Sequence, residues 1–209
     1  MARRCYVSSV RTAEAAAKRD RVIGAAARLL REDASIASFS LDAVAKAAGV
    51  TRLTVYHQFG SRRGLLEAIF DEIARQGGLV QIPEAMAMPD PRAALDLLVE
   101  IFCAFWSSDP AVGRLHEAMA TDAEFAQALI ERNERRRTTI DVLIRRIAGK
   151  IASARARQDV VDMIFALTSF SMFAMLGQNR SAGDVCKLVK SGCRGAVDAL
   201  GGRSAARRR

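Results

Sequence analysis

The sequence predicts an all-α protein of about nine helices. Its apolar residues recur every three or four positions, as on the buried face of a helix, and do not alternate as they do along a strand. The 209 residues include only 4 prolines and 6% aromatic residues, whereas alanine, leucine and arginine, which favour helices, are abundant. Because 50% of the residues are hydrophobic and 26% are charged, the chain can bury a sizeable core, which excludes a disordered protein.

The N-terminal part of the chain contains the first four predicted helices. Residues 1–17 are polar and basic without clear periodicity, so we expect a flexible basic arm there. An apolar stripe at helical spacing follows, formed by Val22, Ala25, Ala26, Leu29 and Leu30. Ser40, Thr51 and Ser61 each precede a further helical pattern and supply a side-chain oxygen as N-cap. The four predicted helices cover 18–32, 41–48, 52–57 and 61–76.

Residues 77–91 separate this part from the rest, because they contain two glycines and three prolines. Helical patterns then cover 91–107, a short segment from 109, 121–151, 158–176 and 181–200. The segment 158–176 is apolar nearly all round, so it must be buried on every side. We therefore expect one domain at 18–76, a larger helical domain at 77–202 and a basic tail at 203–209.

The sequence lacks the signatures of several other protein classes. Its 4 cysteines contain no C-x-x-C pair and it has only 2 histidines, so we expect no disulfide framework, no metal site and no cofactor. The longest apolar stretch, Met163–Leu176, is shorter than the ~20 residues of a membrane span, and no signal-peptide pattern follows Arg3 and Arg4. With no Gly-rich phosphate loop or nucleophile elbow either, we expect a soluble cytoplasmic protein that is not an enzyme.

Positive charge is concentrated near the N-terminus. Of the 32 basic and 23 acidic residues, the first 66 positions hold 12 and 5, and the remaining positions hold 20 and 18. A basic segment on a nearly neutral body is typical of a polyanion-binding module joined to a domain with another role. Four arginines of the segment 121–151 lie close to glutamates, and we interpret them as a solvated helix face: Arg132, Arg135, Arg136 and Arg137.

Residues 41–65 have the pattern of a helix-turn-helix, in which two short helices are joined by a tight turn containing a glycine, here Gly49. In a three-helix DNA-binding domain of this kind, the second helix of the helix-turn-helix, here 52–57, lies in the major groove. Arg52 can donate to a guanine, and Leu53 or Thr54 can pack on a thymine methyl group. We expect DNA contacts from ten residues: Ser40, Leu41, Thr51, Arg52, Leu53, Thr54, Tyr56, His57, Gln58 and Arg62.

Phosphate contacts are expected from three of the ten, because Thr51 and Tyr56 carry hydroxyl groups and Arg62 carries a positive charge. His57 is either a solvated helix residue or a DNA contact. We exclude a catalytic role for it, since no base or nucleophile is placed near it in the sequence.

The run FSLDAVAKAAGVTRLTVYHQFGSRRGLLEAIF resembles the DNA-binding domain of the TetR family of bacterial transcriptional regulators. The matching residues are Ala45, Ala48, Gly49, Val50, Thr51, Tyr56, Phe59, Ser61 and Leu65. The sequence departs from the family pattern at Gln58, where His or Tyr is usual, and at Arg62, where Lys is usual. The resemblance extends upstream to the helix at 18–32.

This resemblance implies a homodimeric repressor that binds a palindromic operator and dimerises through its last two helices. One face of the apolar segment 158–176 would then be core and another a subunit interface. The expected interface residues are Met163, Leu167, Met172, Met175, Val185, Leu188, Val189 and Val197.

The resemblance also implies a small effector bound among the middle helices. A set of eight residues makes an apolar pocket plausible, which favours an uncharged or aromatic ligand, although each residue alone is more often plain core. They are Phe102, Phe105, Trp106, His116, Met119, Phe125, Phe165 and Phe170. His116 and Glu117 are either a polar pair within that pocket or surface residues. The alternative to a ligand-responsive repressor is a DNA-binding protein with no effector, acting architecturally.

Overall fold

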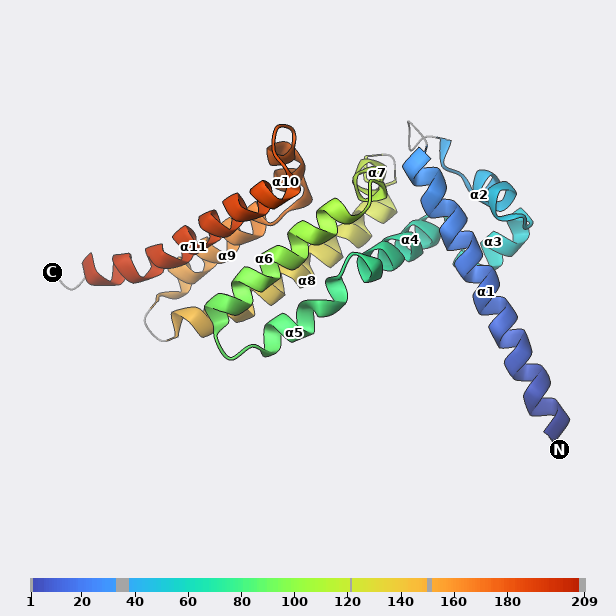
Figure 1. The fold of residues 1–209 in the computed structure, drawn as a ribbon, viewed down its shortest axis with the longest axis horizontal. Helices are drawn as coiled ribbons and strands as arrows, with labels where there is room; N and C mark the ends of the chain where they lie inside the picture. Colours follow the sequence, from blue (N-terminus) through green and yellow to red (C-terminus); the bar gives the residue numbers. More distant parts are fainter. Residues whose placement is uncertain (1, 33–37, 121, 150–151, 207–209) are drawn as a thin grey trace. The chain divides into compact units, whose positions relative to one another are not determined.

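The computed structural model describes residues 2–32, 38–120, 122–149 and 152–206. Over these residues the chain forms eleven α-helices and one short 3-10 helix, and no strand (Figure 1). The prediction of an all-α fold is confirmed. The helix number is higher than nine because one predicted helix is divided in two and because a short helix, Ile82–Ala87, forms within residues 77–91.

The chain divides into two compact units. The first comprises Met1–Ile73 together with Asp109–Ala128, and the second comprises Ala74–Ser108 together with Leu129–Arg209. The sequence pattern placed a boundary at 76–77, close to the first division. It did not predict that residues 109–128 join the N-terminal unit, because the contacts that hold them there join positions far apart in the sequence.

The first unit is built from the N-terminal helices and a later pair. Its elements are α1 (Ala2–Glu32), α2 (Leu41–Ala48), α3 (Arg52–Phe59), most of α4 (Arg62–Gln76), α7 (Ala111–Ala118) and the start of α8 (Ala123–Ala148). Helix α1 packs against α2 and α7, and α2 packs against α3. The core consists of side chains that are almost fully buried, including Val22, Ala26, Leu30, Val44, Val55, Leu65, Leu66, Ile69, Leu115 and Phe125.

Helix α1 begins at Ala2, so the arm expected at residues 1–17 is helical from its second residue onward. Alanines at positions 13 and 15–17 account for this, because alanine has the highest helix propensity and needs no packing partner to favour the helix. Residues 12–21 of α1 are all exposed, and Val22 follows them as a buried residue. The buried part of α1 therefore matches the stripe that the sequence predicted.

The predicted caps are present. The Ser40 Oγ accepts a hydrogen bond from the Ala43 N–H at 3.1 Å, and the Thr51 Oγ1 accepts one from the Thr54 N–H at 3.1 Å. Between them, Gly49 ends α2 with a φ of 64°, in the left-handed region that favours glycine. Ser40 thus fixes the start of α2, and Gly49 and Thr51 fix the sharp turn between α2 and α3.

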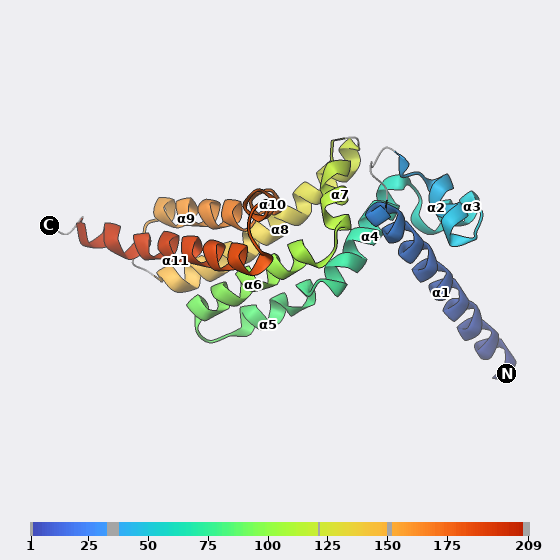
Figure 2. The ribbon, with the colours of Figure 1, turned by 45° about the horizontal axis from the view of Figure 1, so that its top comes forward.

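The second unit is a bundle of longer helices. Its elements are η2 (Leu79–Gln81), α5 (Ile82–Ala87), α6 (Pro91–Ser108), the rest of α8, α9 (Ala154–Leu167), α10 (Phe170–Gly177) and α11 (Ala182–Ala206). Helix α11 lies beside both α6 and α9 (Figure 2). Ion pairs join α6 to α11 along their length: Arg92–Asp198, Asp96–Arg194 and Glu100–Lys190.

The helix predicted over 158–176 is two helices, α9 and α10, which meet at an angle of 51°. Thr168 and Ser169 separate them, because the Ser169 Oγ accepts a hydrogen bond from the Met172 N–H at 3.2 Å and so starts a new helix. Among the described helices, none alone is long and apolar enough to cross a membrane; α9 and α10 meet that test only as a bent pair.

Candidate DNA interface and effector site

Helix α3 turns one face into the first unit and the other face outward. Val55 is fully buried and Phe59 is half-buried, which anchors the helix against its neighbours. On the outer face Leu53 is 62% exposed and Tyr56 is 55% exposed. Large apolar and aromatic side chains exposed this far on a short helix are available to a partner surface.

Five of the ten predicted DNA-contact residues lie on this outer face. Each of them has an exposed side chain; they are Thr51, Arg52, Leu53, Tyr56 and His57. Leu53 is the better placed of the two candidates for a thymine methyl contact. Thr54 is half-buried, and its hydroxyl lies 2.9 Å from the Thr51 hydroxyl, with which it shares a hydrogen bond.

Arg52 is paired with an acidic residue of the preceding helix. Its Nη1 lies 3.1 Å from the Asp42 Oδ2, and both side chains are mostly exposed. An exposed pair of this kind contributes little to stability. It does, however, hold the guanidinium at the junction of α2 and α3, beside the residues on the outer face of α3.

The other five predicted contacts are at least half-buried, and three of them besides Thr54 bond within the first unit. Ser40 caps α2, and the Gln58 backbone carbonyl accepts a hydrogen bond from the Arg19 Nη1 at 3.0 Å. The Gln58 side-chain oxygen is buried. Arg62 donates from Nε to the Phe39 carbonyl at 3.2 Å and from Nη1 to Asp122 at 2.9 Å. DNA contact by the Ser40 and Arg62 side chains therefore competes with bonds that already hold the unit together.

Arg19 was missed by reasoning from the sequence. Its guanidinium stacks over the Phe59 ring, 4.4 Å from the centroid, and binds the end of α3 through Gln58. Arg19 precedes Val22 by three positions, so it continues the line of the apolar stripe of α1, and this spacing could have indicated that it faces α3.

The eight predicted effector residues do not all belong to one unit. His116, Met119 and Phe125 lie in the first unit, where Phe125 is fully buried core and the His116 Nδ1 is 2.9 Å from the Val112 carbonyl of its own helix. The other five lie in the second unit: Phe102, Phe105, Trp106, Phe165 and Phe170. The grouping of all eight in a single pocket stays a prediction.

In the second unit, aromatic side chains surround one buried arginine. We call this group, which consists of Phe102, Trp106, Arg136, Phe165, Thr168 and Phe170, the Arg136 cluster. The Trp106 Nε1 donates to the Thr168 carbonyl at 3.0 Å, and the Trp106 ring meets Phe170 edge-on at 5.7 Å. The Arg136 guanidinium lies 4.1 Å from the Phe165 ring centroid and 5.8 Å from that of Phe102.

The interpretation of Arg136 as part of a solvated face is wrong, because only 8% of the residue is exposed. The spacing of Arg136 could have indicated its burial, because it lies on the same buried stripe of α8 as Leu129, Ile140 and Leu143. Burial, with the neighbouring charge of Arg137, lowers the pKa of Arg136 to about 10. The group therefore stays positively charged at neutral pH.

Of the predicted interface residues, three are core residues of a single protomer. Val185, Val189 and Val197 are buried against the helices next to α11, so they are not available to a second chain. Leu167 and Met172 are half-buried, and three others are exposed: Met163, Met175 and Leu188. The sequence could not separate these two sets, since both are apolar residues at helical spacing.

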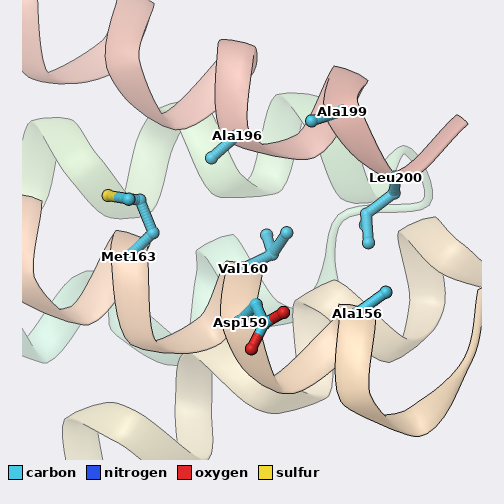
Figure 3. A pocket seen from close by; sticks show the side chains of 7 residues that line it. All are labelled: Ala156, Asp159, Val160, Met163, Ala196, Ala199 and Leu200. Atoms are coloured by element: carbon cyan, nitrogen blue, oxygen red, sulfur yellow. The ribbon is translucent and has the colours of Figure 1, made fainter. Parts of the chain in front are cut away.

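An apolar hollow of about 140 Å³ lies between α9 and α11, next to the exposed Met163 (Figure 3). Seven residues line it: Ala156, Asp159, Val160, Met163, Ala196, Ala199 and Leu200. Its alanines leave the backbones of the two helices close to the surface, and its floor is the nearly buried Val160.

Comparison with known proteins identifies the N-terminal part of the chain. A family model described as bacterial regulatory proteins, tetR family, matches residues 22–69, which contain α2, α3 and the buried part of α1. Helix α3 and its exposed outer face thus lie within the segment that the tetR family model matches.

Curated relatives of the chain are HTH-type transcriptional regulators. The chain is 33% identical over 112 residues to the HTH-type transcriptional regulator EthR of Mycolicibacterium smegmatis, covering 52% of this chain and 51% of that protein. It is 32% identical over 112 residues to EthR of Mycobacterium tuberculosis H37Rv, covering 52% of each. The match thus spans about half the length of these relatives.

Solved structures extend the likeness in fold over most of the chain. A TetR-family transcriptional regulator from Rhodococcus sp., described as putative, aligns with a TM-score of 0.66 at 21% identity, covering 88% of this chain and 98% of that one. The fatty acid degradation regulator FadR from Bacillus halodurans aligns with a TM-score of 0.65 at 21% identity, covering 88% and 96%. At this identity the likeness shows that the tetR-type fold includes the second unit.

Proposed function

We propose that this protein is a DNA-binding transcriptional regulator, a repressor that binds a palindromic operator as a homodimer. The observation that carries the proposal is the outer face of α3, where Arg52, Leu53 and Tyr56 are exposed on the second helix of a tetR-type domain. In a helix-turn-helix this helix enters the major groove and its side chains reach the base edges. Arginine and leucine there match guanine and the thymine methyl group, and tyrosine matches a phosphate.

The homodimer follows from the way helix-turn-helix proteins read DNA. Two recognition helices related by a two-fold axis contact half-sites about 34 Å apart, which makes the operator a palindrome. The exposed apolar residues of α9 and α11 around the hollow, above all Met163, are the surface that a second copy of the chain would cover. Bound to such an operator, the dimer would block transcription.

Release from DNA would come from a small apolar or aromatic effector bound in the second unit. An effector acts by binding more tightly to one conformation of the dimer, and the difference in binding free energy sets the change in DNA affinity. We assign the protein no catalytic activity.

The test is a fluorescence-anisotropy titration of DNA taken from just upstream of the protein's own gene. A shuffled fragment of the same composition is the control, and both are titrated at several salt concentrations, because phosphate contacts make affinity depend on salt. We expect the upstream fragment to bind about 10³-fold more tightly, which is typical of a specific regulator. Equal binding to both fragments, combined with a monomeric mass in light scattering, would contradict the proposal.

A further inference from the structure

Arg136 carries a positive charge inside the second unit, where burial disfavours that charge more than the nearby Glu134 favours it. Arg136 is 8% exposed, and among the described residues it forms no ion pair, whereas its neighbour Arg137 pairs with Asp162 on α9. Removing a charge from water is costly, and buried charges in proteins are ordinarily paired with an opposite charge. The presence of a buried arginine without an ion-pair partner among the described residues is therefore not explained by its contribution to stability.

The hydrogen bonds of Arg136 leave one edge of its guanidinium unused. Nη1 donates to the Phe165 carbonyl at 2.9 Å and to the Thr168 Oγ1 at 2.6 Å. Nε is buried and has no acceptor among the described residues. Nη2 forms no hydrogen bond with any of the described residues either. Nε and Nη2 form the side of the guanidinium to which a carboxylate binds with two parallel hydrogen bonds.

The surroundings of that edge are apolar and largely fixed. The rings of Phe102 and Phe165 lie against the guanidinium, and Trp106 is held by its hydrogen bond to the Thr168 carbonyl. Phe165 and Phe170 are half-buried, so the cluster reaches the surface of the unit. A ligand that matches this environment has an apolar body for the rings and two oxygens for the arginine.

We propose that Arg136 anchors the carboxylate of a small organic acid with an aromatic or aliphatic body, and that this acid is the effector. The role of this acid as the effector rests on the proposed function, whereas the binding site itself is argued from the second unit alone. It changes the ligand class expected from composition, because an uncharged ligand would leave both the charge and the Nε donor of Arg136 unmatched.

A carboxylate fits better than a phosphate. With Nη1 already bonded, Arg136 offers two parallel donors, which match the two oxygens of a carboxylate. A phosphate would need further donors for its additional charge and oxygens. The other polar groups of the cluster already donate within the protein: the Trp106 Nε1 to the Thr168 carbonyl, and the Thr168 hydroxyl to the Ile164 carbonyl at 2.8 Å.

The test uses Trp106, which is the only tryptophan in the sequence and belongs to the cluster, as the reporter. The probes are benzoate, phenylacetate and octanoate, each compared with its uncharged amide, and the readout is the change in tryptophan emission on titration. We expect saturable changes with at least one acid and about 10- to 100-fold weaker binding of its amide, because hydrogen bonds to a charged group are worth more than neutral ones.

Two variants locate the site. Arg136→Met removes the anchor and should abolish the preference for the acid over its amide. Arg135→Met makes the same change at an exposed neighbour on α8 and should leave that preference unaltered. If Arg136→Met does not fold by circular dichroism, Arg136→Lys retains the charge but loses the two-donor edge, and it should also bind the acid more weakly.

The proposal is overturned if no acid changes the emission, if acids and amides bind equally to the wild-type protein, or if the Arg136 variants bind the acids as tightly as the wild type does. A parallel DNA titration separates this result from the proposed function. If acids bind through Arg136 but the protein does not recognise DNA, the binding site stands and the proposed function is contradicted. If the protein binds DNA specifically but binds no acid, the proposed function stands and the binding site is contradicted.

Discussion

Arg62, at the first position of α4, donates a hydrogen bond from Nη1 to the Asp122 Oδ2 at 2.9 Å, across 60 positions of the sequence. The other oxygen of the same carboxylate accepts the Phe125 N–H at 2.9 Å and so caps the start of α8. Arg62 also donates to the Phe39 carbonyl, just before α2. One arginine thus joins the starts of three helices within the first unit.

We therefore expect Arg62→Ala to destabilise the protein by about 1–3 kcal/mol, because it leaves a partly buried carboxylate and a carbonyl without their donor. Urea denaturation measures the change. Arg63→Ala is the control, since Arg63 pairs with Glu67 on the helix surface and its loss should cost about 0.5 kcal/mol. Asp122→Asn should reproduce much of the effect of Arg62→Ala.

The same variant tests the phosphate contact that the sequence suggested for Arg62. A lost phosphate contact would make the slope of log affinity against log salt shallower by roughly one. Because the hydrogen bonds of Arg62 to Phe39 and Asp122 lie inside the unit, we expect the slope to stay unchanged when the variant is measured at a temperature at which it is folded. A shallower slope without loss of stability would assign Arg62 to the DNA interface instead.

Tyr56 is expected to contact a phosphate through its hydroxyl group. Tyr56→Phe removes only that oxygen from a side chain that is 55% exposed, so the fold should be unaffected within about 0.5 kcal/mol. DNA affinity should fall by about 3- to 10-fold, and by the same factor on the upstream and shuffled fragments, since a phosphate contact does not read sequence. A loss confined to one of the two fragments would indicate a base contact instead.

Arg52 is expected to read a guanine. Arg52→Ala should cost about 1–3 kcal/mol at one base-pair position and relax the preference there, as measured by titrating operators mutated one pair at a time. Asp42→Asn removes the partner of Arg52 and one negative charge from the same face, so it should strengthen binding to all DNA modestly. Equal loss on every sequence for Arg52→Ala would contradict its role in base reading.

The part of the fold that could be predicted from the sequence is the part determined by short-range patterns. The stripe from Val22 to Leu30, the Ser40 and Thr51 caps and Gly49 between them are all local, and the structure confirms each. The outer face of α3 follows from the same periodicity, because burying Val55 leaves Leu53 and Tyr56 on the opposite side.

The partners of charged residues could not be predicted in this way. Arg62 resembles a phosphate ligand in the sequence because Asp122 is 60 positions away, and Arg136 resembles a surface residue because arginine is rarely buried. In the same way, Val185 and Met163 are both apolar residues on helices, and only the packing shows that the first is core and the second exposed. Such errors arise wherever a role depends on contacts between distant segments.

Two thiols of the second unit, those of Cys103 and Cys193, are expected to be unreactive in the folded protein. Burial raises the pKa of Cys193 to about 12, and burial together with the neighbouring Cys186 raises the pKa of Cys103 further above its ordinary value. A raised pKa reduces the thiolate fraction at pH 8, and the thiolate is the nucleophile. Iodoacetamide at pH 8 should therefore leave both unmodified by mass spectrometry until urea is added, and rapid alkylation of either in the native protein would contradict their burial.

The hollow between α9 and α11 is the place to test dimerisation. Ala199 lines it and is exposed in a single chain, so Ala199→Glu should leave the protomer folded. It would, however, bury a charge without a partner in any interface formed there, at a cost of several kcal/mol. Light scattering at micromolar concentration should give twice the 22.7 kDa chain mass for the wild type and a single chain mass for the variant.

The matched control is Ala104→Glu, which makes the same substitution at an exposed alanine on α6 and should remain dimeric. Because a palindrome is read by two recognition helices at once, Ala199→Glu should also lose most of the preference for the upstream fragment while retaining weak binding to any DNA. A variant that stays dimeric and keeps its specificity would place the interface on a different face of the second unit.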